Sequence, residues 1–461
     1  MLGQDGGKSG EVRPAYQAFR KWLDSQPDNR VLRKSEQAEN FFRKIGITFN
    51  VYGEDEADER LIPFDVVPRV LSGNEWRKLS KGIEQRVKAI NAFLHDIYHR
   101  QEILRAGRVP ASLIANNAAF LPKMMGFDPP GGIYTHIIGT DIVRTGPDEF
   151  YVLEDNARTP SGVSYMLENR EIMLQMFPEL FADIPIREVG DYPSWLRRSL
   201  SACAPAACLD RPTVAVLTPG VFNSAYFEHS FLADQMGAEL VEGSDLRVVG
   251  GRVQMRTTAG YKPVDVIYRR VDDEFLDPLT FNPDSVLGVP GIMDVYRAGR
   301  LTIANAPGTG VADDKAIYSF MPEIVEFYTG EKRLLPNVET YRCADEESCK
   351  YVLDNLAELV VKEVHGSGGY GMLIGPQASV AEREEFARKI EAEPRNYIAQ
   401  PTIALSRVPT IVDDHLEGRH VDLRPYALYG QEIYIVPGGL TRVAFKKGSL
   451  VVNSSQGGGS K

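Results

Sequence analysis

Apolar side chains at helical spacing dominate the first quarter of the chain. They recur with the period of an α-helix over residues 13–23 and again over residues 75–105. Gly107 and Pro110 then provide a stop signal. We therefore predict that residues 1–125 form a mostly helical N-terminal segment.

A β-hairpin and a further helix are expected next. Residues 134–144 and 150–156 are rich in Ile, Val and Tyr, and turn-forming residues separate them. Helical spacing returns over residues 164–181. The stretch 193–212 is rich in Pro, Ala and Cys, which is typical of a boundary between domains. A new domain is therefore expected to begin near Arg211.

The region after this boundary has the β-α-β rhythm of an open α/β domain. A strand is expected at residues 213–217, a helix at 224–236 and a buried strand at 264–270. The last of these strands ends in Arg269 and Arg270. Because open α/β sheets bind ligands at the carboxyl ends of their strands, we predict that these two arginines face a substrate.

The C-terminal third alternates helices with short strands. This pattern predicts a small, mostly antiparallel sheet covered by helices, followed by further strands. The expected helices are residues 314–328, 345–356 and 380–391, and the expected strands are residues 359–364, 372–374, 396–402, 421–429, 432–436 and 441–445.

The composition is that of a large globular protein. The chain has 461 residues, of which 43% are hydrophobic and 25% charged, enough for two to four domains. No window approaches the roughly 18 apolar residues that a membrane span needs, and the net charge of −11 argues against general nucleic-acid binding. The spacing of the four cysteines matches neither a zinc knuckle nor a disulfide framework. We therefore expect a cytoplasmic protein with no membrane or nucleic-acid partner.

A glycine-rich loop carries the first sign of chemistry. Gly366, Gly368 and Gly371 follow a strand with the spacing of the dinucleotide-binding fingerprint, but that fingerprint needs a helix at its third glycine. Here a short strand follows instead. The loop of Gly366, Ser367, Gly368, Gly369 and Gly371 is therefore expected at the tip of a β-hairpin, where backbone amides can cover phosphates.

Lys362 lies inside the strand that precedes this loop. Its ammonium group can reach the same phosphates, so the lysine and the loop together predict bound ATP. The alternative is an ordinary Gly-rich turn beside a surface lysine, because isolated glycine motifs are weak evidence.

Two other motifs are interpreted as accidental. Residues 3–9 are one residue short of a Walker A loop, but no strand precedes them to hold the loop. His95 and His99 have the i, i+4 spacing of a metalloprotease helix, yet Asp96 stands where the glutamate base belongs. We interpret the two histidines as surface residues of an amphipathic helix.

The expected hairpin brings two carboxylates together. If its turn is symmetric about Pro147 and Asp148, Asp141 lies directly across from Glu154, with the Cβ atoms about 5 Å apart. Like charges so placed repel, so a cation is expected beside them. Side-chain alternation puts Asn156 on the same face as Glu154. These three side chains offer the hard oxygen ligands that Mg²⁺ prefers.

The alternative for this hairpin is a solvated face. Its carboxylates would then pair with Arg144 or Arg158 and hold no metal. A one-residue slip in register would also separate Asp141 from Glu154.

In combination these features resemble the ATP-grasp ligases. The combination is a glycine-loop hairpin with an upstream lysine, a later strand suited to adenine, and a Glu-x-Asn pair on a strand. In most of that superfamily the lysines and the loop precede the acidic strands, whereas here Asp141 and Glu154 come first. That order resembles the circularly permuted ATP-grasp proteins, which include the amide-forming domain of glutathionylspermidine synthetase. The resemblance also rests on residues 153–165, 268–273, 311–315 and 438–444.

The resemblance implies an α/β (α+β) fold, in which an ATP-grasp core in circularly permuted order joins a helical N-terminal segment and a pre-ATP-grasp-like α/β domain. The expected parts are the helical segment at 1–125, the metal-binding hairpin and helix at 126–205, the α/β domain at 206–312, the ATP lid with its glycine loop at 313–405, and strands that complete the core at 406–461.

The resemblance also implies roles for individual residues. Those that would bind ATP are Lys315, Lys362, the glycine loop and the adenine hinge Gln400, Pro401 and Thr402. Those that would bind Mg²⁺ are Asp141, Glu154 and Asn156, and those similar to groups that hold a reacting acyl phosphate are Ser161 and Arg442. The candidates for substrate binding are Arg158, Arg269 and Arg270.

The implied activity is ATP- and Mg²⁺-dependent amide formation between a carboxylate and an amine, each a small molecule or a peptide, through an acyl phosphate. Two alternatives are a phosphotransferase that uses the same ATP site and an inactive nucleotide- or peptide-binding scaffold. The cysteine–histidine amidase domain of bifunctional glutathionylspermidine synthetases has no counterpart, because the helical segment stands in its place. Whether that segment binds a partner protein stays open.

Overall fold

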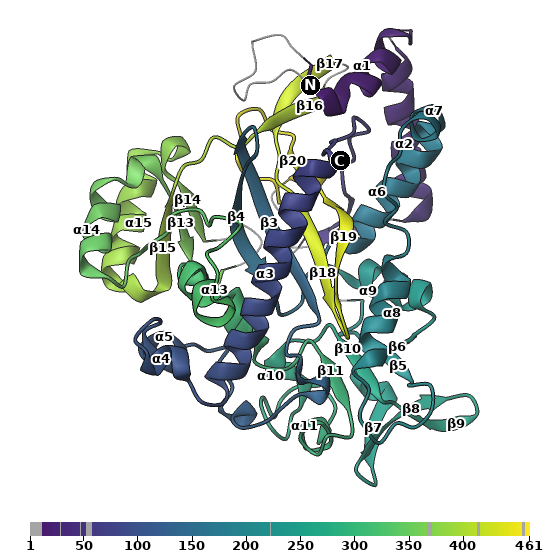
Figure 1. Ribbon diagram of the computed structural model, residues 1–461, viewed down its shortest axis with the longest axis vertical. Helices are drawn as coiled ribbons and strands as arrows, with labels where there is room; N and C mark the ends of the chain where they lie inside the picture. The colour runs from purple at the N-terminus through teal and green to yellow at the C-terminus, as the bar shows by residue number, and fades with distance from the viewer. Residues whose placement is uncertain are drawn as a thin grey trace.

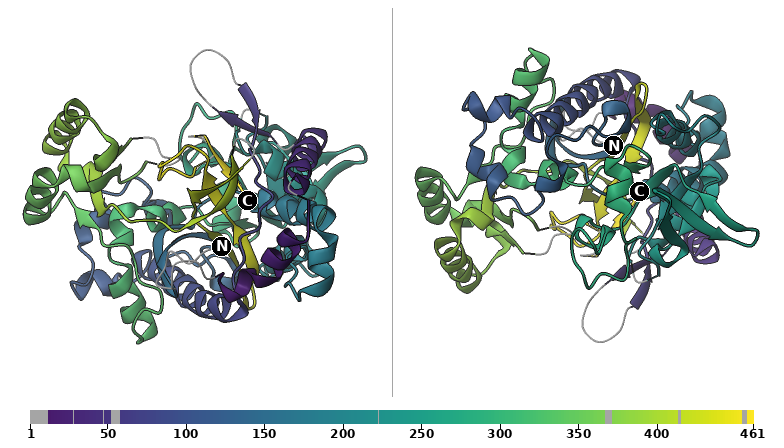
Figure 2. Two further views of the ribbon diagram at one scale, coloured as in Figure 1. Left: turned by 90° about the horizontal axis from the view of Figure 1, so that it is seen from above. Right: turned by 90° about the horizontal axis from the view of Figure 1, so that it is seen from below.

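The computed structural model describes residues 12–27, 29–46, 48–51, 58–221, 223–366, 371–412, 415–453 and 457–461. A central antiparallel sheet stands between a small sheet with its own helices and a parallel sheet at the other end of the molecule (Figures 1 and 2). The predicted mixed α/β class is therefore confirmed. Among the described helices, none combines the length and the apolar character needed to cross a membrane.

The central sheet has the strand order β19-β18-β3-β4 and is covered on both faces. Ile138 and Ile142 pack into the core shared with the long helix α3, whereas Ile137 and Tyr426 pack into the core shared with α6 and α8. This alternation is what a sheet buried on both faces requires. The bounds are β3 Ile137–Gly146, β4 Glu149–Asn156, β18 Arg424–Tyr429, β19 Ile433–Leu440, α3 Gly73–Ile97, α6 Val163–Met176 and α8 Tyr192–Ala202.

The predicted pairing of Asp141 with Glu154 across β3 and β4 is confirmed. The hairpin contains two register shifts, one after Asp141 and one after Arg144, and they cancel. The pairing was therefore predicted correctly although the hairpin is not regular between its turn and these residues.

The parallel sheet has the order β11-β10-β5-β6 and confirms the predicted β-α-β rhythm.

The predicted boundary at residues 193–212 is wrong in its first half, because α8 occupies it. Pro193 lies in the first turn of that helix, where proline is tolerated, and Leu196 and Leu200 bury one face. The bounds are β5 Val214–Leu217, α9 Tyr226–Met236, β6 Glu239–Val241, β10 Val266–Arg269, β11 Thr302–Ala304, and the adjoining meander β7 Leu246–Val249, β8 Arg252–Thr257 and β9 Gly260–Pro263.

The small sheet, with α14 and α15, is called the lid below. Its strands run in the order β12-β15-β13-β14 and are all antiparallel, as predicted, over a separate apolar core. The single helix predicted at residues 314–328 is two helices, since Pro322 starts the second. The bounds are α12 Lys315–Tyr318, α13 Met321–Thr329, β12 Tyr341–Arg342, α14 Glu346–Asp354, β13 Leu359–Glu363, β14 Met372–Ile374, α15 Val380–Ala392 and β15 Tyr397–Pro401.

The described part of the N-terminal segment is mostly helical, as predicted, with one hairpin that the pattern did not reveal. The helix predicted over residues 75–105 breaks at Tyr98 to Gln101, where Gln101 has a φ of 56°. The remaining elements are α1 Gln17–Asp24, α2 Arg30–Ile45, β1 Thr48–Val51, β2 Asp58–Leu61, α4 Glu102–Arg105, α5 Ala111–Ala115, α7 Pro178–Asp183, α10 Asp273–Leu276, α11 Ile292–Arg297, β16 Arg407–Val412, β17 His415–His420, β20 Arg442–Ala444 and β21 Gly458–Ser460.

Candidate active site

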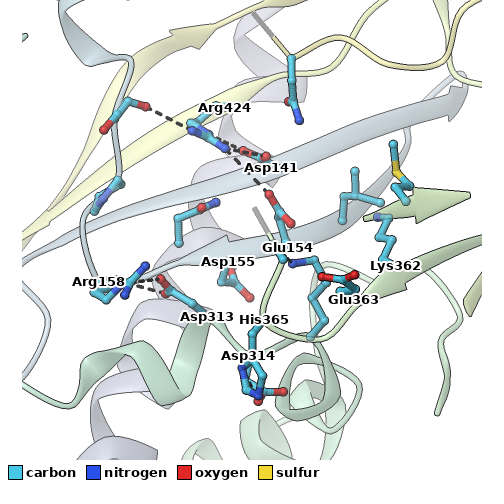
Figure 3. A pocket seen from close by; sticks show the side chains of 18 of the residues that line it. Asp141, Glu154, Asp155, Arg158, Asp313, Asp314, Lys362, Glu363, His365 and Arg424 are labelled. Atoms are coloured by element: carbon cyan, nitrogen blue, oxygen red, sulfur yellow. Dashed lines mark hydrogen bonds and ion pairs between the residues drawn. The ribbon is translucent and has the colours of Figure 1, made fainter. Parts of the chain in front are cut away.

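A cavity of about 990 Å³ lies where the central sheet, the lid and the loops of the parallel-sheet region meet. Figure 3 shows Asp141, Glu154 and Arg424 together on one wall, with Lys362 reaching in from the lid strands. The predicted site residues that line the cavity are Asp141, Glu154, Asn156, Arg158, Ser161, Lys315, Lys362, Gly366, Gln400, Pro401 and Arg442.

Lys362 projects into the cavity because side chains alternate along β13. Its neighbour Val361 packs into the core of the lid, which leaves Lys362 on the opposite face. Its Nζ donates a hydrogen bond of 2.8 Å to Oε1 of Gln400 on the adjacent strand. Burial lowers the pKa of Lys362 to about 8, although the negative charges of Glu154 and Asp141 act in the opposite direction.

A second lysine approaches the start of the glycine loop. Lys315, the first residue of α12, donates a hydrogen bond to the carbonyl oxygen of Gly366. Gly371 lies just before the return strand β14 and has a φ of 64°, and a Cβ there would lie 2.5 Å from the carboxyl carbon of Glu363. Glycine is therefore required at this position. Ser367, Gly368 and Gly369 lie outside the described residues.

The predicted adenine hinge is only partly in the cavity. Gln400 and Pro401 line it, together with the apolar side chains of Val360 and Met372. Thr402 does not, because its hydroxyl and its amide both hydrogen bond to the carbonyl oxygen of Glu358. The lid thus offers a polar edge and an apolar slot of the kind that a flat base occupies.

Asp141 is almost fully buried beside two arginines. Arg424 contacts both of its carboxylate oxygens, and Nη2 of Arg442 lies 2.6 Å from Oδ2. Burial acts to raise the pKa of Asp141, but the two guanidinium groups outweigh it and hold the pKa below its ordinary range. Arg442 also contacts Asp422, so two arginines and two aspartates form one network.

Glu154 and Asn156 face the cavity from β4. Glu154 keeps 27% of its side chain exposed and lies 3.9 Å from Nη2 of Arg424. Asn156 donates from Nδ2 to the carbonyl oxygen of Gly139 at 3.4 Å, which leaves its Oδ1 as the atom for a cation. With Asp141 across the hairpin, the oxygen donors fit a hard cation such as Mg²⁺, with waters and phosphates as its other ligands.

Asp155 anchors the hairpin to α3. Its carboxylate forms a buried ion pair with Arg86, which also donates to Oδ1 of Asn337 at 2.7 Å. Glu154, Asp155 and Asn156 all line the cavity, and of the three it is Asp155 that an ion pair ties to α3.

The loop that carries Ser161 is held by buried charge. The carbonyl oxygen of Ser161 accepts hydrogen bonds from Tyr426 at 3.0 Å and from Arg424 at 3.2 Å. Arg270 donates to Oγ of Ser161 and lies 3.4 Å from Glu228, whose carboxylate in turn accepts from the amide of Gly162 at 2.7 Å. The loop at the cavity wall is thus fixed by a network behind it.

The prediction that Arg269 and Arg270 both face a substrate is wrong in its geometry. Arg269 is fully buried, and its guanidinium donates to the carbonyl oxygens of Asn305 and Val271 and pairs with Asp273. Arg270 stands behind Ser161 and does not line the cavity. A strand buried on both faces satisfies such arginines internally, which a sequence pattern does not reveal.

Arg158 does line the cavity and is partly exposed. Its Nη1 lies 3.3 Å from Asp272, and its backbone amide donates to Asp313 at 3.2 Å. Burial raises the pKa of Asp313 to about 7, although hydrogen bonds from backbone amides and the charge of Arg158 act to lower it. Arg144 lies 2.8 Å from Glu75, and the arginines that pair with Asp141 are Arg424 and Arg442.

Arg424, Asp422 and Asp313 are site residues that the sequence reasoning missed. Asp422 and Arg424 are separated by one residue in a segment predicted as a strand. Two charged side chains on one face of such a strand are a signal that could have identified them. Asp313 stood in a segment that carried the family resemblance, but nothing in its spacing indicated a role.

An antiparallel lid that carries Lys362, with Lys315 beside it on α12, lies opposite a second antiparallel sheet with carboxylates and arginines. This arrangement defines an ATP-grasp protein. The chain belongs to the family of circularly permuted ATP-grasp proteins of type 2, whose model matches residues 68–444. Membership places it among ATP-dependent ligases, a class that uses ATP and Mg²⁺ in general.

The chain has close relatives over nearly its whole length. It is 56% identical to an uncharacterized protein of Synechocystis sp. over 98% of this chain and 94% of the relative. It is 50% identical to an uncharacterized protein of Mycobacterium tuberculosis over 98% of this chain and 81% of the relative.

Two further likenesses concern ligases. A Frankia casuarinae protein whose name proposes it as a glutamate–cysteine ligase is 43% identical over 98% of this chain, which spans 52% of that longer protein. The structure of a glutathione synthetase-like effector of Globodera pallida in its apo form matches with a TM-score of 0.60 at 10% identity. That match covers 95% of this chain and 97% of the effector, and it shows a shared fold.

Proposed function

We propose that this protein is an ATP- and Mg²⁺-dependent carboxylate–amine ligase that forms an amide through an acyl phosphate. The observation that carries the proposal is one cavity with two lysines on the lid side and hard oxygen donors with arginines on the facing sheet. This is the distribution of charge that a bound triphosphate and its metal need.

In this proposal the lid binds the nucleotide. The base occupies the apolar slot beside Gln400 and Pro401, and Lys315 and Lys362 contact the phosphates. The Lys362–Gln400 hydrogen bond holds the ammonium group at the cavity wall before ATP arrives.

Glu154, Asn156 and Asp141 would hold Mg²⁺, which supplies charge neutralisation for the phosphates when it is bound. Asp141 has a second task, because it fixes the guanidinium groups of Arg424 and Arg442 at the cavity wall. These arginines are placed to bind the negative charge that accumulates as a phosphoryl group moves.

The proposed reaction has two steps. An oxygen of the substrate carboxylate attacks the γ-phosphorus of ATP, and ADP leaves, which produces an acyl phosphate. The amine nitrogen then attacks the acyl carbon, loses a proton, and expels inorganic phosphate. No protein nucleophile is needed, so catalysis is positioning and electrostatic stabilisation.

The test is release of ADP and phosphate from the full chain with ATP, Mg²⁺ and a matrix of acids and amines. The name of the Frankia relative makes glutamate and cysteine the first pair, followed by peptides with free carboxylates. We expect ADP, phosphate and amide in equal amounts, and only when both an acid and an amine are present. Phosphorylated product without amide would instead indicate a phosphotransferase, and ATP turnover indifferent to the amine would contradict the proposal.

A further inference from the structure

A cluster of two histidines and an aspartate lies at the C-terminal end of α3. His95 lies in the last turn of α3 and His99 lies just beyond its end, and their rings stack with centroids 4.2 Å apart. Asp128 joins them from a distant loop. Nε2 of His95 lies 3.3 Å from Oδ1 of Asp128, and Nε2 of His99 lies 3.2 Å from the same oxygen.

The hydrogen bonds of His99 determine which of its nitrogens is free. Its Nδ1 lies 2.8 Å from the carbonyl oxygen of His95, and a carbonyl can only accept. Nδ1 therefore carries the proton, and in the neutral ring Nε2 keeps its lone pair. That Nε2 is buried, has no hydrogen-bond partner among the described residues, and faces a carboxylate oxygen that also carries only lone pairs.

Two imidazole nitrogens converge on one carboxylate oxygen, and all three atoms lie within 4.8 Å of one another. Protons on both nitrogens satisfy this oxygen, which can accept two hydrogen bonds, and one metal ion bound by all three atoms satisfies it as well. Two ligands of a tetrahedral metal with bonds of about 2.0–2.1 Å are separated by about 3.3 Å. The two measured nitrogen–oxygen separations of 3.2 and 3.3 Å match that edge.

The loop that carries Asp128 is fixed against the helix. The amide of Gly126 donates to the carbonyl oxygen of Tyr98 at 2.7 Å, and the hydroxyl of Tyr134 donates to the carbonyl oxygen of Phe127 at 2.8 Å. The ring of Phe127 packs edge-on against Tyr296 at 4.8 Å. The loop is therefore positioned before any metal binds, at the helix end where the dipole favours a cation. The two imidazole planes are 9° apart, so the rings must rotate for both Nε2 lone pairs to point at one ion.

We infer that His95, His99 and Asp128 form a binding site for a divalent transition metal of the Zn²⁺ class. Two imidazoles and one carboxylate are the donors that such metals accept, and three protein ligands leave one coordination position for water or an incoming group. Asp96, which separates this helix from the metalloprotease pattern, has a structural task, because it accepts the amides of Glu102 and Ile103 at the start of α4. The third ligand comes from Asp128 instead.

The experiment uses the untagged full chain, stripped with a chelator and then loaded with Zn²⁺ in excess Mg²⁺, so that the hairpin oxygens are occupied. Zinc retained after desalting is measured by mass spectrometry, and Co²⁺ is titrated by its visible absorption. The variants are His95→Gln, His99→Gln and Asp128→Asn. His415→Ala, an exposed histidine beside Glu417, is the matched control.

We expect the parent chain and His415→Ala to retain one zinc more per chain than the cluster variants, with affinity at least about tenfold weaker when one ligand is lost. Equal zinc in the parent and in both His95→Gln and His99→Gln would overturn the inference. So would zinc that is lost in Glu154→Gln but kept in His99→Gln. Circular dichroism of the metal-free proteins checks folding, and the exposed His95 and Asp128 keep the test valid if His99→Gln misfolds. Ligase activity is not needed for any of these readouts.

Discussion

Asp141 shows how single residues set the chemistry of the cavity. It is 1% exposed and remains ionised because Arg424 and Arg442 pair with it. Removing one member of such a buried ion pair leaves the charge of its partners buried without a counter-charge, which is strongly destabilising. Glu154 is more exposed and lies at the edge of this network. It is therefore the residue at which metal binding can be tested without unfolding the protein.

Glu154→Gln keeps the size of the side chain and removes its charge. We expect turnover to fall by about 100-fold or more, because the oxygen donors for the metal lose their exposed carboxylate. The free energy of unfolding should change by less than about 0.5 kcal/mol. Glu149→Gln, at the exposed start of the same strand, is the control and should leave both unchanged. Full activity of Glu154→Gln would contradict the assigned role.

Lys362 gives a second prediction, in the pH dependence of nucleotide binding. Its pKa in the free protein is lowered to about 8, so its positive charge is present below that pH and is lost above it. If only the charged form binds phosphates, affinity for an ATP analogue should fall about fivefold between pH 8 and pH 9.

Calorimetry at several pH values measures this decline. Lys362→Arg retains its charge throughout this range, so its affinity should stay level above pH 8. A parent chain whose affinity is independent of pH would show that the ammonium group does not contact the nucleotide.

At the scale of elements, the hairpin β3–β4 is held in place by α3. The link is the buried pair of Arg86 and Asp155, and Asp155 lies between two residues that face the cavity. We expect Arg86→Met to lower the free energy of unfolding by about 3–5 kcal/mol, because Asp155 is left buried without its partner.

Urea unfolding followed by circular dichroism measures this change. Lys88→Met on the exposed side of the same helix breaks only a surface pair with Glu84, and should cost no more than about 0.5 kcal/mol. Equal stability of the two variants would mean that the buried pair does not anchor the hairpin.

The sequence predicted those elements whose side chains follow one clear period. The hairpin, the lid and the parallel strands were predicted because apolar alternation and turn residues agree there. The register of Asp141 and Glu154 was also predictable, although only because two irregularities cancel. Helix α8 was missed because it contains a proline and leads into a stretch rich in Pro, Ala and Cys, which is typical of linkers when burial is unknown.

Residues at the cavity could be predicted where a local sequence motif contains them. Lys362 and the glycines are adjacent in sequence, and Glu154 and Asn156 share a strand face. Arg424 was missed because its importance comes from Asp141, a contact across 283 positions that no local pattern encodes. Arg269 was predicted to face a substrate because it ends a strand of an open sheet. In the folded chain it instead donates to backbone carbonyl oxygens, and no local sequence pattern indicates those contacts.

At the scale of the whole molecule, the cavity exists only because three parts of the chain meet. The lid provides Lys362 and α12 provides Lys315, the central sheet and the loop after β4 provide the oxygen donors and Arg158, and the loop after β10 provides Asp272 (Figures 1 and 3). Neither the lid nor the hairpin alone can hold both a nucleotide and its metal. The central claim is therefore a claim about simultaneous binding across the cavity.

The most direct test is a crystal structure of the full chain with a non-hydrolysable ATP analogue and Mn²⁺, which replaces Mg²⁺ and is located by its anomalous scattering. The account predicts the base beside Gln400 and Pro401, phosphates between Lys315 and Lys362, and manganese bound by Glu154 and Asn156. A nucleotide outside the cavity, or manganese bound without either of these two side chains, would contradict it.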